Sequence, residues 1–526
     1  MVMSNLDKSR RWRSCAIAAS FALLMTSTCG ARAQSAEAPV VAQIGSDAAV
    51  TVHIGQAPAL PSVPPPPGIN FNRPTPGAGT LRQGAAPPPN SRPTAPSSPA
   101  SPLALFTQIP SVNQNVGGTF PPDGDIATSV RFVVQANNLV LTMYDLSNGT
   151  LAKQVNFNTF FGDATSFIFD PRVIFDPVWQ RFVVLADACN PCSGATTNTF
   201  VKLAISTTSD PTGGFFQYSF NAGTPAGDFL DFPQLGMDLN SIIITYNDFM
   251  LSGGFDARTF AIAKAYLYNG FGFSVPLFGG SGCTVAPPYV LDNGGPSYTL
   301  VACPGDSGVF LGPISNSGLT NVSVTHWQAK VPTPGFGVPP CAPQPGVNYC
   351  LDTSDSRFEN RSAQIGNRIW NVNTVAAGTA TPQWYEFRTD DSTLVNSGIW
   401  FATGTSTDWH PSIVVNGVGA TATSPTGETF GTWMSVDAAN NRNLQLRAIG
   451  GSFDSAGSGA GIAVGPASAL PLTNQTFNGN RSGDYSYISL YPGPVGACAA
   501  NEFAILEGEV SLGTIWGTRI GVVRHC

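Results

Sequence analysis

The sequence predicts an all-β fold preceded by a proline-rich segment. Charged residues make up only 11% of the 526 residues, against about 25% in typical soluble domains. Glycine and proline are abundant, at 56 and 44 residues. From about residue 105 onward, short β-branched and aromatic runs alternate with turn residues, as in Leu139–Tyr144, Phe260–Leu267 and Phe503–Leu506. This texture favours strands and excludes helical bundles.

The first 33 residues have the three parts of an export signal. A basic start at Lys8–Arg13 is followed by the apolar stretch Cys15–Cys29 and by the small-residue cleavage pattern Ala31-Arg32-Ala33. We therefore expect residues 1–33 to be a signal peptide and the mature protein to be periplasmic or extracellular. No apolar run reaches the roughly 18 residues that a membrane span requires. The net charge of −7 becomes more negative without this leader, which argues against nucleic-acid binding.

Residues 34–104 are rich in proline, with runs at Pro64–Pro67 and Pro87–Pro89 and few large apolar side chains. Such a composition cannot bury enough surface to order itself. We expect a disordered tether over residues 34–104 and a folded domain over residues 105–526. A peptide ligand for a proline-binding domain is the alternative interpretation of the segment.

Eight cysteines remain after removal of the leader, an even number that suits an oxidising compartment. Their spacing favours pairing between neighbours in the sequence, although other connectivities stay open. The expected disulfides are Cys189–Cys192, Cys283–Cys303, Cys341–Cys350 and Cys498–Cys526.

A weak repeat suggests how the strands are organised. An acidic or polar residue, often followed by proline, precedes a short apolar strand. The clearest instances are Asp170–Ile174, Asp231–Leu235, Asp408–Ile413 and Asp484–Ile488. Looser versions near Pro288 and Arg361, with an opening unit near Ser129, give about seven units of about 60 residues. The repeat predicts a seven-bladed β-propeller with long loops, and a pair of β-sandwiches is the alternative.

The candidate site follows from this architecture. In a propeller the first strand of each blade lines the central channel, so residues just before those strands gather at one mouth. Carboxylates beside arginine or tyrosine at such a mouth can bind sugar hydroxyls, hold calcium or perform acid–base chemistry. The candidate ligand-binding residues are Asp170, Arg172, Asp231, Arg361, Asp408, His410, Arg481, Asp484 and Tyr485. Each aspartate could instead cap its own turn.

Two further expectations concern ligands. Asp228 adds a second carboxylate to the loop of Asp231 and makes calcium an option there, while no other cofactor and no catalytic residue is indicated. Tryptophan rings could stack on sugar faces, although such a ring more often belongs to the core. The tryptophans considered are Trp179, Trp384, Trp400 and Trp409.

Six segments stand out as a set: Pro121–Asp125, Tyr144–Gly149, Phe169–Pro177, Ser206–Gly213, Asp231–Gly236 and Gly483–Ser486. In this order they resemble a family of secreted bacterial β-propeller proteins that has no assigned activity. The resemblance covers roughly residues 117–510 and implies a sialidase-like propeller fold rather than an activity. The segment from Ser424 to Trp433 lacks the aspartate and the spacing of a sialidase Asp box, so no sialidase role is implied.

Two functions from different classes fit these observations. The first is an exported, monomeric propeller that binds a carbohydrate or another envelope or extracellular polymer at the channel mouth. The second is a glycoside hydrolase or polysaccharide lyase that uses carboxylates at the same mouth. An enzyme would need two carboxyls about 5–10 Å apart, one of them with a raised pKa. We favour binding because the sequence contains no recognisable catalytic motif.

Overall fold

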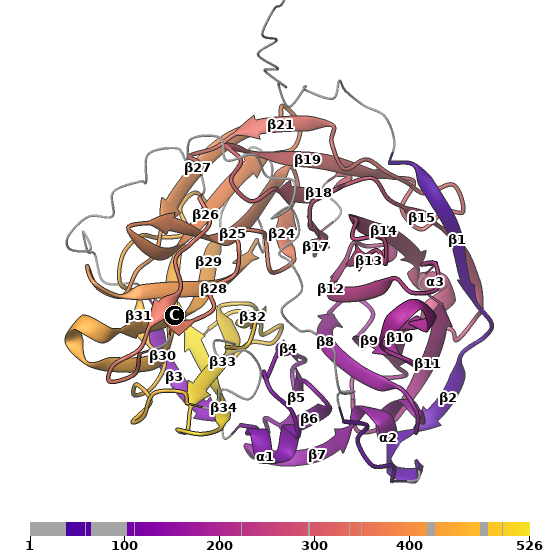
Figure 1. Ribbon diagram of the computed structural model, residues 1–526, viewed down its shortest axis with the longest axis horizontal. Helices are drawn as coiled ribbons and strands as arrows, with labels where there is room; N and C mark the ends of the chain where they lie inside the picture. Colours follow the sequence, from indigo (N-terminus) through magenta and orange to yellow (C-terminus); the bar gives the residue numbers. More distant parts are fainter. Residues whose placement is uncertain are drawn as a thin grey trace, which may run out of the picture. The chain divides into compact units, whose positions relative to one another are not determined.

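Antiparallel sheets of four or five strands are the repeating unit of the fold. The computed structural model describes residues 38–526 except 58, 65–102, 110, 222, 293–294, 336, 349, 418–426, 474–481 and 497. The described residues belong to one unit, Ser35–Cys526, in which the sheets follow one another around a ring (Figure 1). The predicted all-β, propeller-like architecture is confirmed. The expected signal peptide lies outside the described residues.

The first two sheets around the ring are antiparallel and follow the chain order. The first contains β4 (Asp125–Thr128), β5 (Phe132–Asn137), β6 (Val140–Asp145) and β7 (Thr150–Asn156). The second contains β8 (Phe167–Asp176), β9 (Arg181–Cys189), β10 (Thr199–Ser206) and β11 (Gly214–Asn221), with β2 (Val50–His53) at its edge.

A ten-stranded sheet comes next and contains two antiparallel groups. One group is β12 (Phe229–Met237), β13 (Ser241–Phe249), β14 (Phe255–Ala263) and β15 (Phe273–Phe278), with β1 (Val40–Ser46) at its edge. The other is β24 (Ser362–Ile365), β25 (Arg368–Ala377), β26 (Thr379–Arg388) and β27 (Thr393–Ile399). The short strand β17 (Pro288–Val290) joins them because it pairs in parallel with both β12 and β24.

Two sheets lie between these groups in the chain. The larger one contains β16 (Val285–Ala286), β18 (Ser297–Ala302), β19 (Gly308–Ser315), β20 (Ser323–Val324) and β21 (Ala329–Pro332). The smaller one pairs β22 (Ala342–Pro343) with β23 (Cys350–Leu351).

The last two sheets complete the ring and include a strand from the beginning of the domain. One contains β28 (Thr407–Asn416), β29 (Glu428–Asp437), β30 (Arg442–Ser452) and β31 (Ile462–Ala463). The other contains β32 (Tyr487–Leu490), β33 (Phe503–Ser511) and β34 (Trp516–Arg524), with β3 (Ala104–Ile109) paired to β34. Because β3 directly precedes the first sheet in the chain, this pairing ties the two ends of the ring together.

The expected count of seven blades is not confirmed by the division into sheets. Five sheets of four or five strands are separate, whereas β12–β15 and β24–β27 are parts of one sheet. The bridging strand β17 can approach β12 closely because position 236 is a glycine, and a Cβ there would collide with the Pro288 carbonyl.

The boundary predicted for the tether is wrong at its N-terminal side. Residues 40–46 and 50–53, expected within a disordered segment, form β1 and β2 on the edges of β15 and β11. The physical reason is the apolar residues of this stretch: Ile44 is 3% exposed and packs in the core of the neighbouring sheets. Residues 65–102, with both proline runs except Pro64, lie outside the described residues.

The α-helices of the described residues are few and short. They are α1 (Gln114–Gly117), α2 (Phe157–Phe161) and α3 (Lys264–Leu267). The strand expected over Phe260–Leu267 is wrong in its second half, because β14 ends at Ala263 and α3 follows. None of the helices in the described ranges has the length and apolarity to cross a membrane.

Apolar cores fill the spaces between neighbouring sheets, as the amphipathic faces of the strands require. One core joins Ile174 and Leu203 of the second sheet to Leu235 and Ile244 of the next. The structure also contains the four disulfides that the spacing favoured: Cys189–Cys192, Cys283–Cys303, Cys341–Cys350 and Cys498–Cys526. Disulfides of this number are typical of an oxidising compartment.

Candidate functional site

The strands β8, β12 and β28 lie close to the centre of the ring (Figure 1). They share an unusual backbone feature. Each contains a bulge in its pairing with the next strand, and each bulge contains a residue followed by proline. The residues before proline are Asp170, Phe232 and His410, with φ angles of 47°, 57° and 48°. Left-handed φ is unfavourable for non-glycine residues, and strain of this kind clusters at functional sites. Three of the four clearest instances of the sequence repeat are therefore bulges of this kind.

Side chains near these bulges bind the backbone of the next segment. Asp125 Oδ2 on β4 accepts a hydrogen bond from the Val173 amide on β8 at 2.9 Å. Arg172 Nε on β8 donates to the Pro233 carbonyl on β12. Gln234 on β12 donates in turn to the carbonyl of residue 359 at 2.6 Å. The first three central strands are thus linked in order.

The same pattern continues until it returns to its start. Asn360 Nδ2 donates to the Pro411 carbonyl at 2.8 Å and to the Ser486 carbonyl at 3.2 Å. The amide of Asp484 then donates to Asp123 Oδ1 at 2.7 Å, two residues before β4. We call this closed series of side-chain-to-backbone bonds, from Asp125 round to Asp123, the central belt. The belt fixes the residues that precede the inner strands relative to one another.

Three of the predicted aspartates meet at one place on this belt. The pKa of Asp170 is raised well above its ordinary value by burial and by the carboxylates of Asp231, Asp123 and Asp484. Asn138 connects two of these groups, since it donates to Asp123 Oδ2 at 2.8 Å and accepts from the Asp170 amide at 2.8 Å. Asp231 and Asp484 are half-buried, whereas Asp170 is 7% exposed. We call Asp123, Asp170, Asp231 and Asp484 the acidic mouth.

Arg172 lies against this mouth on a bed of aromatic rings. Its guanidinium carbon is 3.6 Å from the ring centre of Tyr485, 5.1 Å from that of Tyr487 and 5.8 Å from that of Phe232. Arg172 is 1% exposed, and within the described part of the chain its Nη1 and Nη2 have no hydrogen-bond partner. The predicted pair Arg172 and Tyr485 is therefore brought together, with the guanidinium stacked on the phenol.

His410 faces a carboxylate that the sequence did not indicate. Its Nδ1 lies 3.0 Å from Glu359 Oε2, and both side chains are 1% exposed. The two atoms form an ion pair without the alignment of a good hydrogen bond. Burial lowers the pKa of His410, but the interactions with Glu359 and the charges of Asp484 and Asp352 together outweigh burial, so the net direction is upward. Burial raises the pKa of Glu359 despite the opposing effect of His410.

Two further acids, Asp187 and Glu509, were also missed. Burial raises the pKa of Glu509 on β33 to about 8, against a hydrogen bond from the Gly483 amide, whose nitrogen lies 2.7 Å from Glu509 Oε2. Burial and the charge of Asp231 raise the pKa of Asp187 well above its ordinary value. Acids inside otherwise apolar strands are the signal that could have identified both residues.

Other predicted residues are placed differently. Asp408 is not brought to the acidic mouth: it accepts hydrogen bonds from Trp433 Nε1 at 2.8 Å and Ser406 Oγ at 2.6 Å, inside its own sheet. The physical reason is register, because Asp408 lies three residues before the proline of its bulge, whereas Asp170 lies one before. Arg361 pairs with Asp125 at 2.8 Å, within the belt. Arg481 lies outside the described residues.

Of the four candidate tryptophans, three are buried and one is exposed. Trp384, Trp400 and Trp409 are at most 2% exposed and belong to the core. Trp179 is 55% exposed at the turn between β8 and β9 and contacts Tyr268 edge to face. The ring surfaces at the acidic mouth belong instead to Phe232 and Tyr485, whose centres are 5.1 Å apart.

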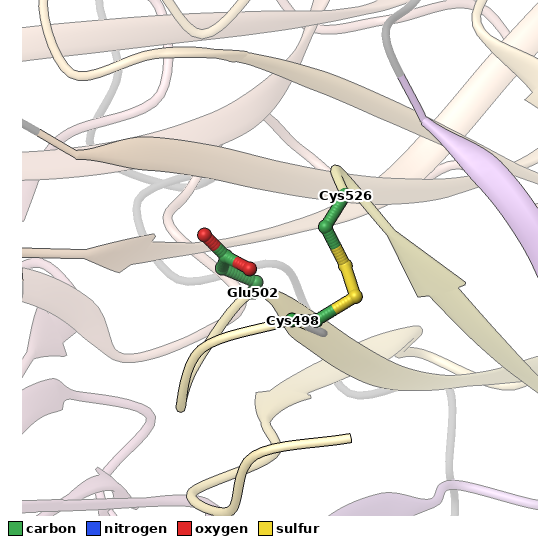
Figure 2. Close-up of side chains that lie close together, drawn as sticks. All are labelled: Cys498, Glu502 and Cys526. Carbon is green, nitrogen blue, oxygen red and sulfur yellow. A yellow bond between two sulfur atoms is a disulfide. The ribbon is translucent and has the colours of Figure 1, made fainter. Parts of the chain in front are cut away.

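A metal centre has little support among the described residues. The one group of three donors within reach of a common ion is Cys498, Glu502 and Cys526. Figure 2 shows that the two cysteines are bonded to each other as a disulfide, so neither sulfur offers the thiolate that a metal requires. In the loop considered for calcium, Asp228 Oδ1 accepts from the Leu251 amide at 2.8 Å and caps a turn.

A separate hollow of about 870 Å³ lies on the flank of the ring. It is lined by the segment around Asp47, by Lys202 and by residues 217–221, and none of the predicted site residues borders it. Lys202 lines this hollow, but its Nζ already forms an ion pair with Asp163 at 2.7 Å.

No protein-family model and no curated protein matches the chain. Solved structures that are similar to it have low identity. An alpha-L-arabinanase from Penicillium chrysogenum complexed with arabinobiose shares 9% identity over 80% of this chain and 99% of that chain, with a TM-score of 0.34. The RRP9 WD40 repeats share 8% identity over 82% of this chain and 100% of that chain, with a TM-score of 0.36. A Trypanosoma rangeli sialidase mutant displaying trans-sialidase activity shares 11% identity over 68% of this chain and 53% of that chain, with a TM-score of 0.32. At these values no residue role is transferred.

Proposed function

We propose that the protein is an exported propeller that binds a carbohydrate or another envelope or extracellular polymer at the acidic mouth. The observation that carries this proposal is the convergence of Asp123, Asp170, Asp231 and Asp484 on one place, although they come from four separate segments. The half-buried carboxylates of Asp231 and Asp484 suit sugars, because carboxylates accept hydrogen bonds from hydroxyls.

We further propose seven blades for the ring. Support comes from the inner strands: β4, β8, β12, β17, β24, β28 and β32 contact one another in this order, and β32 contacts β4. In this interpretation the ten-stranded sheet is two blades whose inner strands are bridged by β17. We expect the protein to act as a monomer outside the cytoplasm, in keeping with its four disulfides.

A glycan array tests the binding proposal with the full mature chain. The expected result is a defined set of bound glycans, and the Asp231→Asn/Asp484→Asn variant should lose the signal because both carboxylates are half-buried at the mouth. Repeating the array with calcium and with a chelator tests whether calcium contributes. Glycan binding that is unchanged in the double variant would place the binding site elsewhere.

Catalysis at the same mouth is a second candidate function, and the raised pKa of Asp170 favours it. A carboxyl whose pKa is raised by burial and by neighbouring carboxylates is the arrangement of a general acid in glycoside hydrolysis. Burial and three carboxylates raise the pKa of Asp170 in this way. If the protein is a glycoside hydrolase or lyase, Asp170→Asn should reduce turnover of a bound polysaccharide by a factor of about 100 or more. Equal turnover in the wild type and the variant would remove Asp170 from a catalytic role.

A further inference from the structure

We propose that the hollow on the flank of the ring, here called the flank hollow, is a docking site for an extended peptide segment with a basic side chain. The segment adds a strand to the edge of β11. Three observations carry the inference: an unpaired strand edge, the cavity of about 870 Å³ beside it, and a carboxylate at the cavity that forms no ion pair. The inference is independent of the carbohydrate site at the acidic mouth.

The flank hollow lies where the chain crosses from the edge of β15 to the edge of β11 (Figure 1). Ser46, the last residue of β1, still pairs with β15. Val50, the first residue of β2, pairs with Gln217 of β11. Between them the Ala49 amide donates to the Gly270 carbonyl at 2.9 Å and so draws the chain away from β11. The pairing of β2 therefore does not extend to the last four residues of β11.

These four residues, Tyr218–Asn221, have a strand on one side only. They pair with β10, and no other described strand pairs with them. The amide of Thr207, directly after β10, donates to the Gly214 carbonyl at 2.8 Å, so the even-numbered residues of β11 bond to β10 and the odd-numbered ones point away from it. Ser219 and Asn221 thus direct their N–H and C=O groups to the free edge. Both residues are exposed, and within the described ranges nothing bonds to these backbone groups.

An unpaired edge of this kind is a template for a further strand. Ser219 and Asn221 offer two donors and two acceptors at the spacing that one added strand requires. Both residues line the flank hollow, as does the segment Gly45–Ala48, where the chain leaves β15. The volume lies within the range of about 300–1,000 Å³ of ligand pockets. The occupant that fits this arrangement is an extended backbone about four residues long, matching Tyr218–Asn221.

The side chains at the flank hollow define the chemistry of the segment. Val50, which is 67% exposed, and Phe161 offer apolar contacts. The charged residues of the lining are Asp47 and Lys202. Lys202 Nζ is compensated by Asp163 Oδ2 at 2.7 Å, whereas Asp47 is exposed and forms no ion pair within the described part of the chain. The remaining charge is therefore negative and favours a lysine or arginine in the added strand.

Fluorescence polarisation with the full mature chain tests this docking. The probe is the fluorescein-labelled peptide Val-Thr-Val-Lys-Val-Thr, and we expect it to bind saturably below about 1 mM. Methylation of its central backbone amides should weaken binding at least about tenfold, because the methyl groups block pairing with a strand edge. Replacement of its lysine by glutamate should weaken binding about threefold or more, because the glutamate repels Asp47.

Two variants of Ser219 separate its backbone from its side chain. Proline is tolerated in an edge strand where its nitrogen faces outward, so Ser219→Pro removes the outward donor and leaves the pairing with β10 in place. We expect Ser219→Pro to bind the lysine peptide at least about tenfold more weakly. Ser219→Ala keeps the amide and should bind as the wild type does. Near-ultraviolet circular dichroism checks the folding of each variant.

A substitution at Asp47 tests the charge and does not depend on the folding of Ser219→Pro. Asp47→Asn should weaken binding of the lysine peptide about threefold, as expected for an exposed ion pair. Asp391→Asn makes the same change at an exposed position and should leave binding unchanged.

The outcomes are decisive for this site. Absence of saturable binding up to about 1 mM, or equal binding of the methylated and unmethylated peptides, would overturn strand docking. Unchanged binding in a folded Ser219→Pro would overturn it by placing the peptide elsewhere, and equal binding of the lysine and glutamate peptides would overturn the charge selection. A wild-type dimer in sedimentation velocity that becomes a monomer in Ser219→Pro would assign the edge to a second copy of the chain instead. None of these results involves Asp231 or Asp484, so the carbohydrate proposal stands or falls separately.

Discussion

Three residues that precede proline in the inner strands have a strained backbone. A left-handed φ costs about 1–3 kcal/mol for a non-glycine residue, and it occurs at Asp170, Phe232 and His410. Each of these side chains then lies at the belt or the acidic mouth, not in a regular position of its strand. The dipeptides with proline were visible in the sequence, but their φ was not, because the residue before proline normally prefers an extended conformation.

The buried acid Glu509 predicts how stability depends on pH. Burial raises its pKa in the folded protein to about 8 from an ordinary value of 4.5. The folded state therefore holds a proton that the unfolded state releases. Its contribution to stability is present below pH 4.5 and is lost as the pH rises towards 8. We expect the unfolding free energy of the wild type to fall by several kcal/mol, about 1.4 kcal/mol per pKa unit at most.

The variant Glu509→Gln tests this dependence because an amide keeps the shape and cannot ionise. Urea unfolding at pH 5, 7 and 9 should show a smaller loss of stability in Glu509→Gln than in the wild type. Asp391→Asn, at an exposed position, should follow the wild-type curve. Parallel curves for the wild type and Glu509→Gln would mean that Glu509 is ionised in the folded state.

At the scale of elements, the central belt predicts that Asn360 contributes to stability. Asn360 is 0% exposed and donates to the Pro411 and Ser486 carbonyls on two different segments. Removing a buried donor costs about 1–3 kcal/mol for each acceptor left without a partner. We therefore expect Asn360→Ala to lower the unfolding free energy by about 2–5 kcal/mol in chemical denaturation.

A matched asparagine provides the control for this prediction. Asn396 also donates to a carbonyl, that of Asp454 at 2.7 Å, but this bond is exposed. Asn396→Ala should cost about 1 kcal/mol or less. Similar losses in the two variants would show that the belt has no special role in holding the segments together.

The edge strand β1 gives a second prediction at this scale. Ile44 is 3% exposed against the core, whereas Val50 on β2 is 67% exposed. Ile44→Asp would bury an unpaired carboxylate and remove apolar burial, so we expect a loss of about 3–5 kcal/mol. Val50→Asp should change stability by about 0.5 kcal/mol or less. Equal stability of Ile44→Asp and the wild type in urea unfolding would contradict the assignment of β1 to the fold.

The strand β1 also shows why part of the chain was misjudged from sequence. Residues 40–53 contain four valines, one isoleucine and no proline, whereas the proline-rich composition that predicts disorder belongs to the residues that follow. Edge strands need only a few residues, because the neighbouring sheet already supplies their pairing partner and half of their core.

For the whole molecule, local patterns predicted the architecture better than they predicted the site. Alternating apolar runs and turn residues are local and indicate sheets, and the repeat indicates that these sheets recur. The blade count depends on β17, three residues long, whose parallel pairing joins two groups. Three aspartates of the repeat lie together in the structure, but Asp408 does not. The bulges correspond to one another at their prolines, and Asp408 lies further from its proline than Asp170 does.

The central claim is that Asp231 and Asp484, more than 250 positions apart in the sequence, face one ligand at one mouth. Carboxyl footprinting tests it most directly: exposed carboxyls are labelled with a carbodiimide and an amine, with and without the glycan that gives the strongest array signal, and each site is quantified by mass spectrometry. We predict that the ligand protects Asp231 and Asp484 together and leaves Asp391 and Asp454 unchanged. Protection of Asp47 beside the flank hollow, with Asp231 and Asp484 labelled as before, would contradict the account.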